Sequence, residues 1–365
     1  MTSSVGRPDQ RLEALEHAAH LAMRAPSVYN TQPWTLALHD DRLELFADRT
    51  RQLHALDPHG RELVLSVGAA LGNVRVALAA RGWAIEVDRL PDPARPDLMA
   101  VVRPVPGPPD PELAQLGGAV GERRTSRRGF TAEQVPVEVL DHLAAAAGAE
   151  GALVVPVVTA DQRGLVARLT READAVQNAD AAYRAELRRW TMQRPDNADR
   201  VPASTVPHID GREDDDVPLR DFDTRGADEL PADTHADGDQ TMVLIATRVD
   251  DEPAWLRAGE ALERVLLELT RLGWATSAVT QAVEVLRTRA QLRDAVCGGC
   301  HPQALLRIGH ASPTARAPRR NRADLVSNSH RAESSPPAPH RQAPTPRNNT
   351  RRRPAPDGRG GTTWP

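Results

Sequence analysis

The amino-acid sequence predicts an α+β fold in which the chain is divided into two related halves. Several segments place apolar residues at i, i+3 and i+4, the spacing of an amphipathic helix. Between them lie short segments in which apolar and polar residues alternate, as in strands joined by tight turns. The third observation is an internal repeat, in which residues 68–83 resemble residues 259–274 without a gap.

The first half, residues 10–105, contains two helical segments and four strand-like segments. The first helical segment, 10–25, ends before Pro26 because proline cannot continue a helix. The second runs from Gly60 to Gly82 and is rich in Ala, Leu and Val. The expected strands are 34–38, 42–47, 83–90 and 97–105, and the first two form a hairpin.

The second half, residues 111–326, follows a proline-rich turn. Residues 193–240 are polar and acidic with little periodicity, which predicts a long excursion or lid, because structureless loops of this length are usually functional or disordered. Residues 327–365 are rich in Pro, Arg, Ser and Thr, and we expect a disordered tail. The expected helices of this half are 111–120, 136–148, 160–189, 254–272 and 283–296, and the expected strands are 152–160, 241–249 and 304–310.

The repeat aligns Gly68 with Gly259 and the Gly82-Trp83 pair with Gly273-Trp274. Both segments are expected to be helices that close on glycine, the usual residue at a left-handed helix end. Alanine-rich helices resemble one another by chance, so the paired Gly-Trp endings carry most of the weight. Two related halves in one chain predict a fused pseudo-dimer that is a monomer or a weak homodimer.

Charge and composition argue against several classes of partner. A net charge of −4 gives no general attraction to nucleic acid or to an anionic membrane. No segment approaches the roughly 20 apolar residues of a membrane span, and the N-terminus lacks the apolar core of a signal peptide. We therefore expect a cytoplasmic protein with no membrane or nucleic-acid partner. The sequence contains no lysine, so an anion site must use arginine.

Two arginine clusters are candidate anion sites. Residues 121–130, GERRTSRRGF, place four arginines and two hydroxyl side chains just before a helical segment. Residues 315–322, ARAPRRNR, follow the last expected strand. Arginine forks bind phosphate in a bidentate manner, and hydroxyls add donors. Taken alone, the 121–130 cluster is better explained as a solvated basic loop, whereas a phosphate held between the two clusters would use both.

A polar turn after the first helix is the other candidate site. The stretch PSVYNTQPW brings Ser27, Asn30 and Gln32 close together in the sequence. Asparagine and glutamine present a donor and an acceptor side by side, which suits the edge of a heterocycle. Trp34 is expected to anchor the following strand in the core.

These motifs together resemble the nitroreductase superfamily of flavoproteins. The element APSVYNTQPW occurs in the first half, and RRTSRRGF followed by VPVEVL occurs in the second. The stretches ADRTRQLHALDPHGRE, AGEALERVLLELTRLGW, PQALLRIG and RRNRADLV extend the resemblance to the Acg family of actinobacterial, dormancy-associated flavoproteins over about residues 10–326. The resemblance implies mostly antiparallel central sheets flanked by helices and one composite FMN site, with each half supplying one element.

The resemblance also implies roles for individual residues, while the flavin itself carries the chemistry and no metal is required. Arg123, Thr125 and Arg127 would meet the phosphate, the ribityl chain and the ring edge, and a cation there would stabilise the anionic reduced flavin. The remaining implied contacts are Ser27 and Asn30 from the first half, Thr280 and Gln281 toward flavin N5, and Arg319 and Arg320 closing on the phosphate.

Two functions follow from the resemblance. The first is an NAD(P)H-dependent oxidoreductase that passes electrons to a nitroaromatic or quinone-like acceptor. The second is an FMN-binding or storage protein, with residues 193–240 forming a lid over the flavin and little or no turnover. The CGGCH stretch at 297–301 matches the c-type haem attachment pattern. Haem attachment requires export and zinc requires four ligands, so a loop without a cofactor is the better interpretation.

Overall fold

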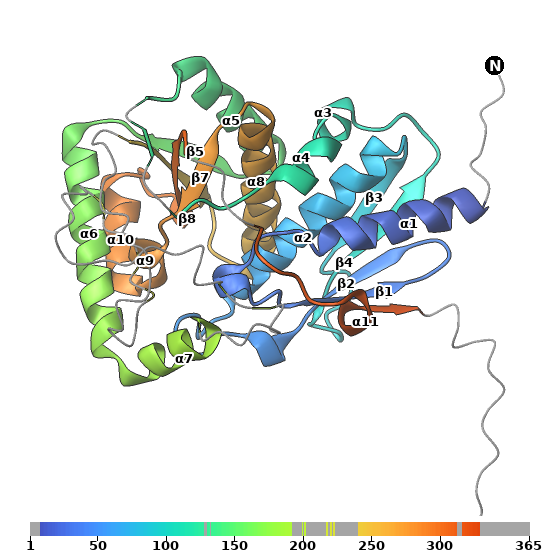
Figure 1. Cartoon of the computed structure of the whole chain (residues 1–365), viewed down its shortest axis with the longest axis horizontal. Coiled ribbons are helices and arrows are strands. Elements are labelled where there is room, and N and C mark those ends of the chain that lie inside the picture. The colour runs from blue at the N-terminus through green and yellow to red at the C-terminus, as the bar shows by residue number, and fades with distance from the viewer. Residues whose placement is uncertain are drawn as a thin grey trace, which may run out of the picture.

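The computed structural model describes residues 8–127, 130–131, 133–191, 240–311 and 316–328, together with the single residues 199, 201, 217, 220 and 222. Most of the excursion expected at 193–240 and the tail beyond residue 328 therefore lie outside the described residues. Figure 1 shows two sheets, each with helices beside it, and two long helices, α2 and α8, between them.

The first-half sheet contains five strands in the order β3-β4-β2-β1-β9. The expected hairpin is confirmed, since β1 and β2 pair in antiparallel register with Leu36 opposite Leu45. Both residues are buried in the core beneath α1 and α2. The bounds are α1 Pro8–Ala22, η1 Val28–Asn30, β1 Trp34–Leu38, β2 Leu43–Ala47, η2 Arg49–Arg51, α2 Arg61–Ala80, β3 Ala84–Arg89 and β4 Leu98–Val105.

The end of the described chain returns to this first sheet. The short helix α11 (Arg322–Leu325) leads into β9 (Val326–Asn328), which pairs in parallel with β1. Residues 327 and 328, placed in the tail by the sequence, are thus part of a strand. By its packing, the segment 316–328 belongs with the first half, although it follows the second half along the chain.

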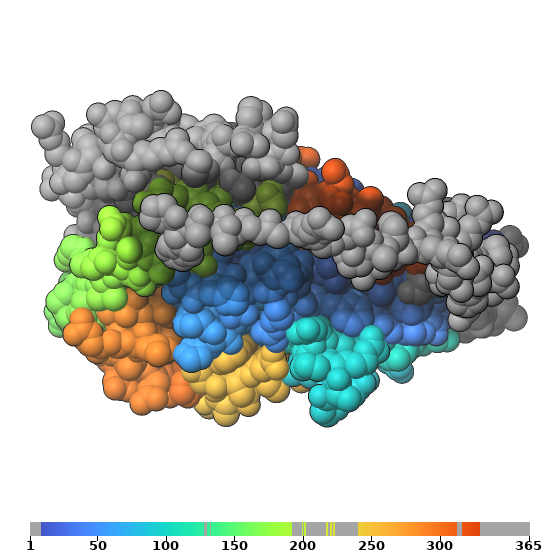
Figure 2. Space-filling view, turned by 90° about the horizontal axis from the view of Figure 1, so that it is seen from below, coloured from blue at the N-terminus to red at the C-terminus, as the bar shows by residue number. Residues whose placement is uncertain are grey.

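The second-half sheet contains four strands in the order β5-β6-β8-β7, and all neighbours are antiparallel. An α+β architecture with mostly antiparallel sheets is therefore confirmed. Seen from below, Figure 2 shows the blue first-half residues side by side with green and orange segments of this half. The bounds are α3 Pro111–Ala114, α4 Gly117–Glu122, α5 Val137–Ala149, β5 Leu153–Val157, α6 Ala160–Ala179, α7 Ala181–Thr191, β6 Thr241–Thr247, α8 Glu252–Arg271, β7 Ala275–Ala278, α9 Gln281–Glu284, α10 Leu286–Ala295 and β8 His301–Gly309.

Some expected elements differ in detail. Three expected helices are each divided in two: 111–120 into α3 and α4, 160–189 into α6 and α7, and 283–296 into α9 and α10. The break between α6 and α7 falls at Asp180, which has extended backbone angles. The strands β7 and β9 were not expected from the sequence. β7 consists of small residues, and β9 has three residues whose partner strand lies far away along the chain.

Helices α2 and α8 cross at Gly68 and Gly259, the two glycines that the repeat aligns. A Cβ atom on Gly68 would lie 2.1 Å from the carbonyl oxygen of Leu256, and one on Gly259 would lie 2.1 Å from that of Leu65. The contact is reciprocal, as in a two-fold interface. Both helices end on a glycine with φ of 83°, Gly82 and Gly273. The two repeat segments therefore share a helix, an end and a crossing point.

Helix α2 alone among the described helices is long and apolar enough to span a membrane by composition. Within the structure, 89% of its most apolar window is buried, as expected for the central helix of a core. Its position between the two sheets also places its polar residues beside the candidate site.

Candidate functional site

The turn between α1 and β1 has a strained backbone. Tyr29, Asn30 and Gln32 have φ values of 49°, 57° and 48°, in the left-handed region that side chains rarely adopt. The Oγ of Ser27 accepts a hydrogen bond from the backbone N–H of Gln32 at 2.9 Å, which closes the turn. Such outliers persist only where the surroundings impose them, and they concentrate at functional sites.

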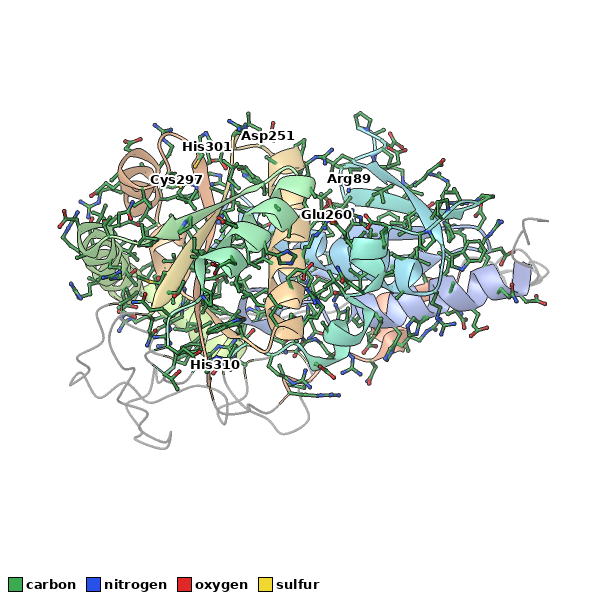
Figure 3. The ribbon with its side chains drawn as sticks, turned by 90° about the horizontal axis from the view of Figure 1, so that it is seen from above. Arg89, Asp251, Glu260, Cys297, His301 and His310 are labelled. Carbon is green, nitrogen blue, oxygen red and sulfur yellow. The ribbon has the colours of Figure 1, made fainter. Side chains whose placement is uncertain are left out.

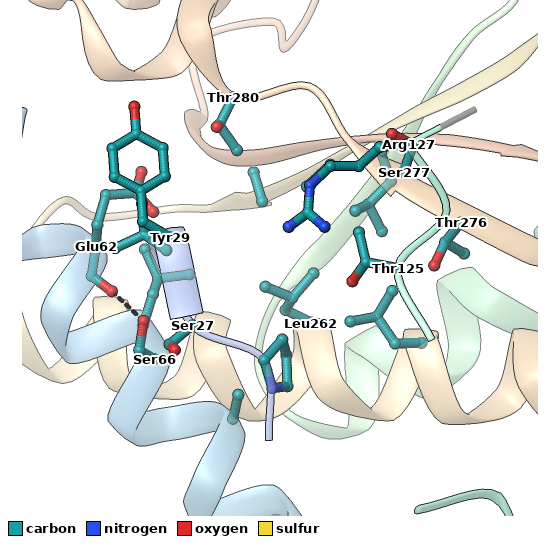
Figure 4. A pocket seen from close by; sticks show the side chains of 18 of the residues that line it. Ser27, Tyr29, Glu62, Ser66, Thr125, Arg127, Leu262, Thr276, Ser277 and Thr280 are labelled. Carbon is teal, nitrogen blue, oxygen red and sulfur yellow. Dashed lines mark hydrogen bonds between the residues drawn. The ribbon is translucent and has the colours of Figure 1, made fainter. Parts of the chain in front are cut away.

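This turn forms one wall of a cavity that we call the main pocket. Figure 4 shows Tyr29 and Glu62 on one side and Arg127 reaching in from the other, with Thr125 and Thr276 beside it. Helices α2 and α8, strands β7 and β8 and the segment after α4 also supply lining residues. The full lining is Pro26, Ser27, Val28, Tyr29, Glu62, Leu65, Ser66, Ala69, Thr125, Arg127, Arg220, Phe222, Leu262, Leu266, Thr276, Ser277, Ala278, Thr280, Ala304 and Leu306.

A second cavity, the arginine pocket, adjoins the first. The two share Pro26, Ser27, Thr125 and Arg127, so one elongated ligand would reach both. Its lining is dominated by guanidinium groups from three separate parts of the chain, near residues 24, 125 and 318. The lining is Arg24, Pro26, Ser27, Asn30, Val120, Gly121, Arg123, Arg124, Thr125, Arg127, Arg316, Ala317 and Arg319.

The arginine pocket carries a local excess of positive charge. Burial, followed by the charge of the neighbouring Arg123, lowers the pKa of Arg319 to about 9. Burial, followed by the charges of Arg220 and Arg123, lowers the pKa of Arg127 to about 10. Burial and the charge of Arg316 also lower the pKa of Arg124. Because these cations repel one another in a partly desolvated site, the pocket is suited to an anion.

One carboxylate lies behind this cluster. Glu263 of α8 is fully buried, and its Oε1 is 3.4 Å from the Nε of Arg123. Burial raises the pKa of Glu263 to about 7, against the opposing effect of Arg123. The other end of Arg123 donates to the carbonyl of Arg24 at 3.0 Å. Arg123 is therefore fixed between the end of α1 and the middle of α8.

The expected residues of the 315–322 cluster have different roles. Arg319 lines the arginine pocket, and its guanidinium donates to Asn30 Oδ1 and to the carbonyls of Arg24, Ala25, Ala317 and Pro318 at 3.0–3.3 Å. It thus fastens the returning chain to the polar turn. Arg320 lines neither pocket, because its guanidinium donates to the carbonyl of Gln32 at 3.1 Å and lies 3.8 Å from Asp48.

The two residues expected near flavin N5, Thr280 and Gln281, differ in whether they reach a pocket. Thr280 lines the main pocket, whereas Gln281 is 1% exposed and lines neither pocket. Ser27, Asn30, Thr125 and the remaining predicted arginines lie in one or both cavities. The structure therefore brings together seven of the nine expected residues, from segments almost 300 positions apart, and leaves out Arg320 and Gln281.

The expected excursion contributes Arg220 to the main pocket. Its guanidinium donates to Tyr29 Oη, to Tyr183 Oη at 2.5 Å and to Glu284 at 2.6 and 2.7 Å. The two tyrosines are the only ones in the chain, and their hydroxyls are 3.0 Å apart. Arg220 is buried, so this network fixes a residue of the excursion against the pocket wall.

A carboxyl group, Glu62 of α2, lines the same wall. Burial raises its pKa to about 7, and the nearby charges of Glu284 and Asp57 act in the same direction. The side chain of Arg61 donates to it, which opposes the rise. Glu62 thus gives the main pocket a group that changes charge near neutral pH.

The repeat places a different set of residues on the opposite side of the helix crossing. The positions aligned with the pocket residues Ala69 and Leu266 are Glu260 and Arg75. Arg75 donates to Glu260 at 2.7 Å, and Arg89 of β3 donates to both oxygens of Glu260 at 2.7 and 2.8 Å. Figure 3 shows Arg89 and Glu260 meeting at the side of α8. Ion pairs therefore occupy the positions that the sequence repeat aligns with these two pocket residues.

The CGGCH stretch lies apart from the pockets, near the start of β8, where Figure 3 labels Cys297 and His301. Both cysteines are free, and the Sγ of Cys300 lies 2.8 Å from the carbonyl oxygen of Cys297. The described residues contain no group of three or more His, Cys, Asp or Glu side chains placed to hold a metal ion.

Sequence reasoning missed several lining residues. Arg24 directly precedes the quoted APSVYNTQPW element, and Arg316 lies within the quoted 315–322 cluster but was not singled out. Glu62 lies in a helix that appeared to be purely a core element. Arg220 is one of many charges in an acidic segment, and nothing in the local sequence distinguishes it. Tyr29 lay within the quoted turn and had no assigned role.

The chain is similar to several known proteins. No family model matches the chain. It is 36% identical over 324 residues to "Putative NAD(P)H nitroreductase Rv3131" of Mycobacterium tuberculosis H37Rv, covering 86% of this chain and 91% of the relative. It is 33% identical over 316 residues to "Putative NAD(P)H nitroreductase acg" of the same strain, covering 84% and 93%. "Uncharacterized protein Rv3127" is 33% identical over 318 residues, covering 83% and 89%.

Solved structures show a more distant likeness. A nitroreductase with bound FMN from Desulfitobacterium hafniense is 15% identical, with a TM-score of 0.37, and the match covers 58% of this chain and 97% of that one. A "putative nitroreductase" from Anabaena variabilis is 10% identical, with a TM-score of 0.46, covering 85% and 90%. On the strength of the sequence relatives, which match over most of both chains, this chain belongs to the Acg-type nitroreductase family.

Proposed function

We propose that this protein is an FMN-dependent oxidoreductase of nitroreductase type, with NAD(P)H as electron donor and a nitroaromatic or quinone-like acceptor. The observation that supports it best is the pair of adjoining cavities. One has largely apolar walls with a few hydroxyl groups, and the other is lined by arginines. A flat heterocycle joined to a phosphate has this division of polarity.

The described residues fit FMN. The Nε atom of Arg319 has no hydrogen-bond partner among the described atoms, and the cluster around it has an excess of positive charge. A phosphate dianion would offset that charge. The phosphate would be held by Arg24, Arg123, Arg124, Arg316 and Arg319, and the ribityl chain would pass Ser27 and Thr125.

FMN, when bound, supplies two-electron chemistry at N5 of its ring. The protein's part is to hold the ring and to balance its charge. Arg127 faces the main pocket, and no carboxylate pairs with it among the described residues, so its charge is available to an anionic ring edge. Leu65, Leu262 and Leu266 exclude water from the inner wall.

Purification tests the proposal directly. The protein should be yellow, contain about one FMN per chain and bleach when NADH or NADPH is added without oxygen. A colourless protein that does not take up FMN would overturn it. In a second test, Arg123→Ala should weaken FMN binding at least about tenfold, because a charge-assisted hydrogen bond contributes about 1.5–3 kcal/mol. Binding of riboflavin, which lacks the phosphate, should change little.

A second candidate function is FMN binding with little or no turnover. Arg220 and Phe222, both from the expected excursion, line the main pocket, and Arg220 is fixed there by Tyr29, Tyr183 and Glu284. A ring covered in this way would exclude a hydride donor. Under this function the protein is yellow, and its flavin stays oxidised with either nicotinamide but is reduced by dithionite.

A further inference from the structure

We infer that Glu263 is a built-in competitor for the cofactor phosphate, so that binding of a phosphate dianion in the arginine pocket is accompanied by proton uptake at Glu263. This inference rests on the proposed function for the identity of the ligand. It assigns a role to a buried group that neither the chemistry of the flavin nor the packing of the core requires.

The first argument is the position of Glu263. It lies on α8, is fully buried and lines neither pocket, and its Oε1 is 3.4 Å from the Nε of Arg123, which lines the arginine pocket. Neither of its oxygens has a hydrogen bond of full strength among the described residues, and the Asn73 side chain supplies only a weaker one. A buried carboxylate normally accepts several hydrogen bonds, and leaving it without them is costly. The group is therefore held in its ionised form mainly by the charge of Arg123.

The second argument is the charge that surrounds it. The groups that face Glu263 are Arg123 at the end of α4, Arg319 of the returning chain and the neutral Asn73 of α2. The two arginines favour the ionised form, whereas burial favours the neutral one, and the balance leaves a pKa of about 7. A small electrostatic change at Arg123 therefore decides whether Glu263 carries a proton.

A phosphate dianion supplies such a change. It brings about two negative charges to the same guanidinium cluster and reduces the attraction between that cluster and the carboxylate. The phosphate, the arginines and Glu263 interact more strongly than they would in water, because the effective dielectric constant inside a protein is about 20 rather than 80. Glu263 then takes a proton from solvent and becomes a neutral acid. The bound state thus holds one more proton than the free state, so affinity for the dianion falls as the pH rises above 7.

Calorimetry of apoprotein with FMN at pH 8, in two buffers of different ionisation enthalpy, measures the protons taken up. At this pH the phosphate of FMN is already a dianion, because its second pKa is about 6. We expect uptake of more than half a proton for FMN and close to none for riboflavin. Arg319, with a pKa of about 9, adds about a tenth of a proton.

Glu263→Gln should abolish most of the uptake and bind FMN about tenfold more tightly at pH 8, with a flat affinity between pH 7 and 8.5. Glu122→Gln is the matched control, since Glu122 ends α4 beside the same cluster but is exposed. It should leave the uptake unchanged. Equal uptake in the wild type and in Glu263→Gln overturns the inference while FMN binding still supports the proposed function.

Inorganic phosphate as a second ligand separates the two ideas. If FMN does not bind but phosphate binds with proton uptake that Glu263→Gln removes, the inference holds and the proposed function fails. If neither ligand binds the apoprotein, both are overturned. A folding defect in Glu263→Gln is detected by circular dichroism. In that case Glu263→Asp decides the matter. The shorter carboxylate lies farther from Arg123, so proton uptake should persist with its pH midpoint shifted. The same pH midpoint as in the wild type would count against the inference.

Discussion

The crossing of α2 and α8 allows a sharp test, because Gly68→Ala adds one methyl group at the closest point between the two halves. The new Cβ would lie 2.1 Å from the carbonyl oxygen of Leu256 and 2.9 Å from the Cα of Gly259. An ordinary C···O approach is about 3.3 Å, so the helices must separate by about 1 Å. Both obstructing atoms belong to the backbone and cannot turn aside.

Separation costs packing along the whole crossing. Overpacking a core typically costs about 1–3 kcal/mol, and alanine regains at most about 1 kcal/mol of helix propensity. We expect a net loss of about 1–2 kcal/mol in the free energy of unfolding, measured by urea denaturation followed by circular dichroism. FMN binding should weaken as well, because the main pocket is bounded by Leu65 of α2 and Leu262 of α8.

Two comparisons make the test strict. Gly164→Ala in α6 adds the same methyl group with no heavy atom within 4 Å, so it should stabilise the protein by up to about 1 kcal/mol. The double variant Gly68→Ala/Gly259→Ala should lose less than the sum of the two single changes, because one separation relieves both clashes. The reasoning is refuted if Gly68→Ala is as stable as Gly164→Ala, or if the two losses simply add.

Three further predictions concern charged groups. In the folded apoprotein the pKa of Glu263 is about 7, above its ordinary 4.5, so the folded state binds more protons than the unfolded state between these pH values. The free energy of unfolding should therefore fall as the pH rises from 4.5 to 7. Glu263→Gln should remove up to about 3 kcal/mol of that fall, measured by urea titrations at pH 5 and 8. Arg220→Ala leaves Glu284 buried and unpaired and should cost about 3–5 kcal/mol, with part of the loss recovered by adding Glu284→Gln; full stability of the single variant would mean that the ion pair contributes nothing. Arg319→Ala removes the hydrogen bonds to the polar turn and should increase proteolysis near residue 316 in limited digestion, whereas the exposed Arg322→Ala should not.

The sequence predicted the parts of the fold that depend on local pattern. The hairpin and the helices α2 and α8 were predicted from the spacing of their apolar residues. The ends of the two helices were predicted from Gly82 and Gly273, which adopt the left-handed conformation. β7 was missed because Ala275–Ala278 are small residues whose strand pairing depends on β8. β9 was missed because its partner, β1, is supplied by the opposite end of the chain.

The candidate site was predicted where charge and hydrogen-bonding capacity are visible in a motif. Arg123, Thr125 and Arg127 lie in a short run whose composition alone indicates an anion site. The sequence does not show which arginine faces inward, and so Arg320 was included although it bonds to Gln32. Glu62 and Arg220 became visible only with the packing, since burial rather than sequence context gives each its role.

The return of residues 316–328 to the first sheet has a consequence for biosynthesis. β9 pairs with β1 across about 290 residues of intervening chain, and the same segment supplies Arg316 and Arg319 to the arginine pocket. A ribosome adds about 5–20 residues per second, so tens of seconds pass between the synthesis of β1 and that of β9. During that interval β1 is paired only with β2, and the arginine pocket is incomplete. The arginine pocket is therefore completed only after residue 319 has been synthesised.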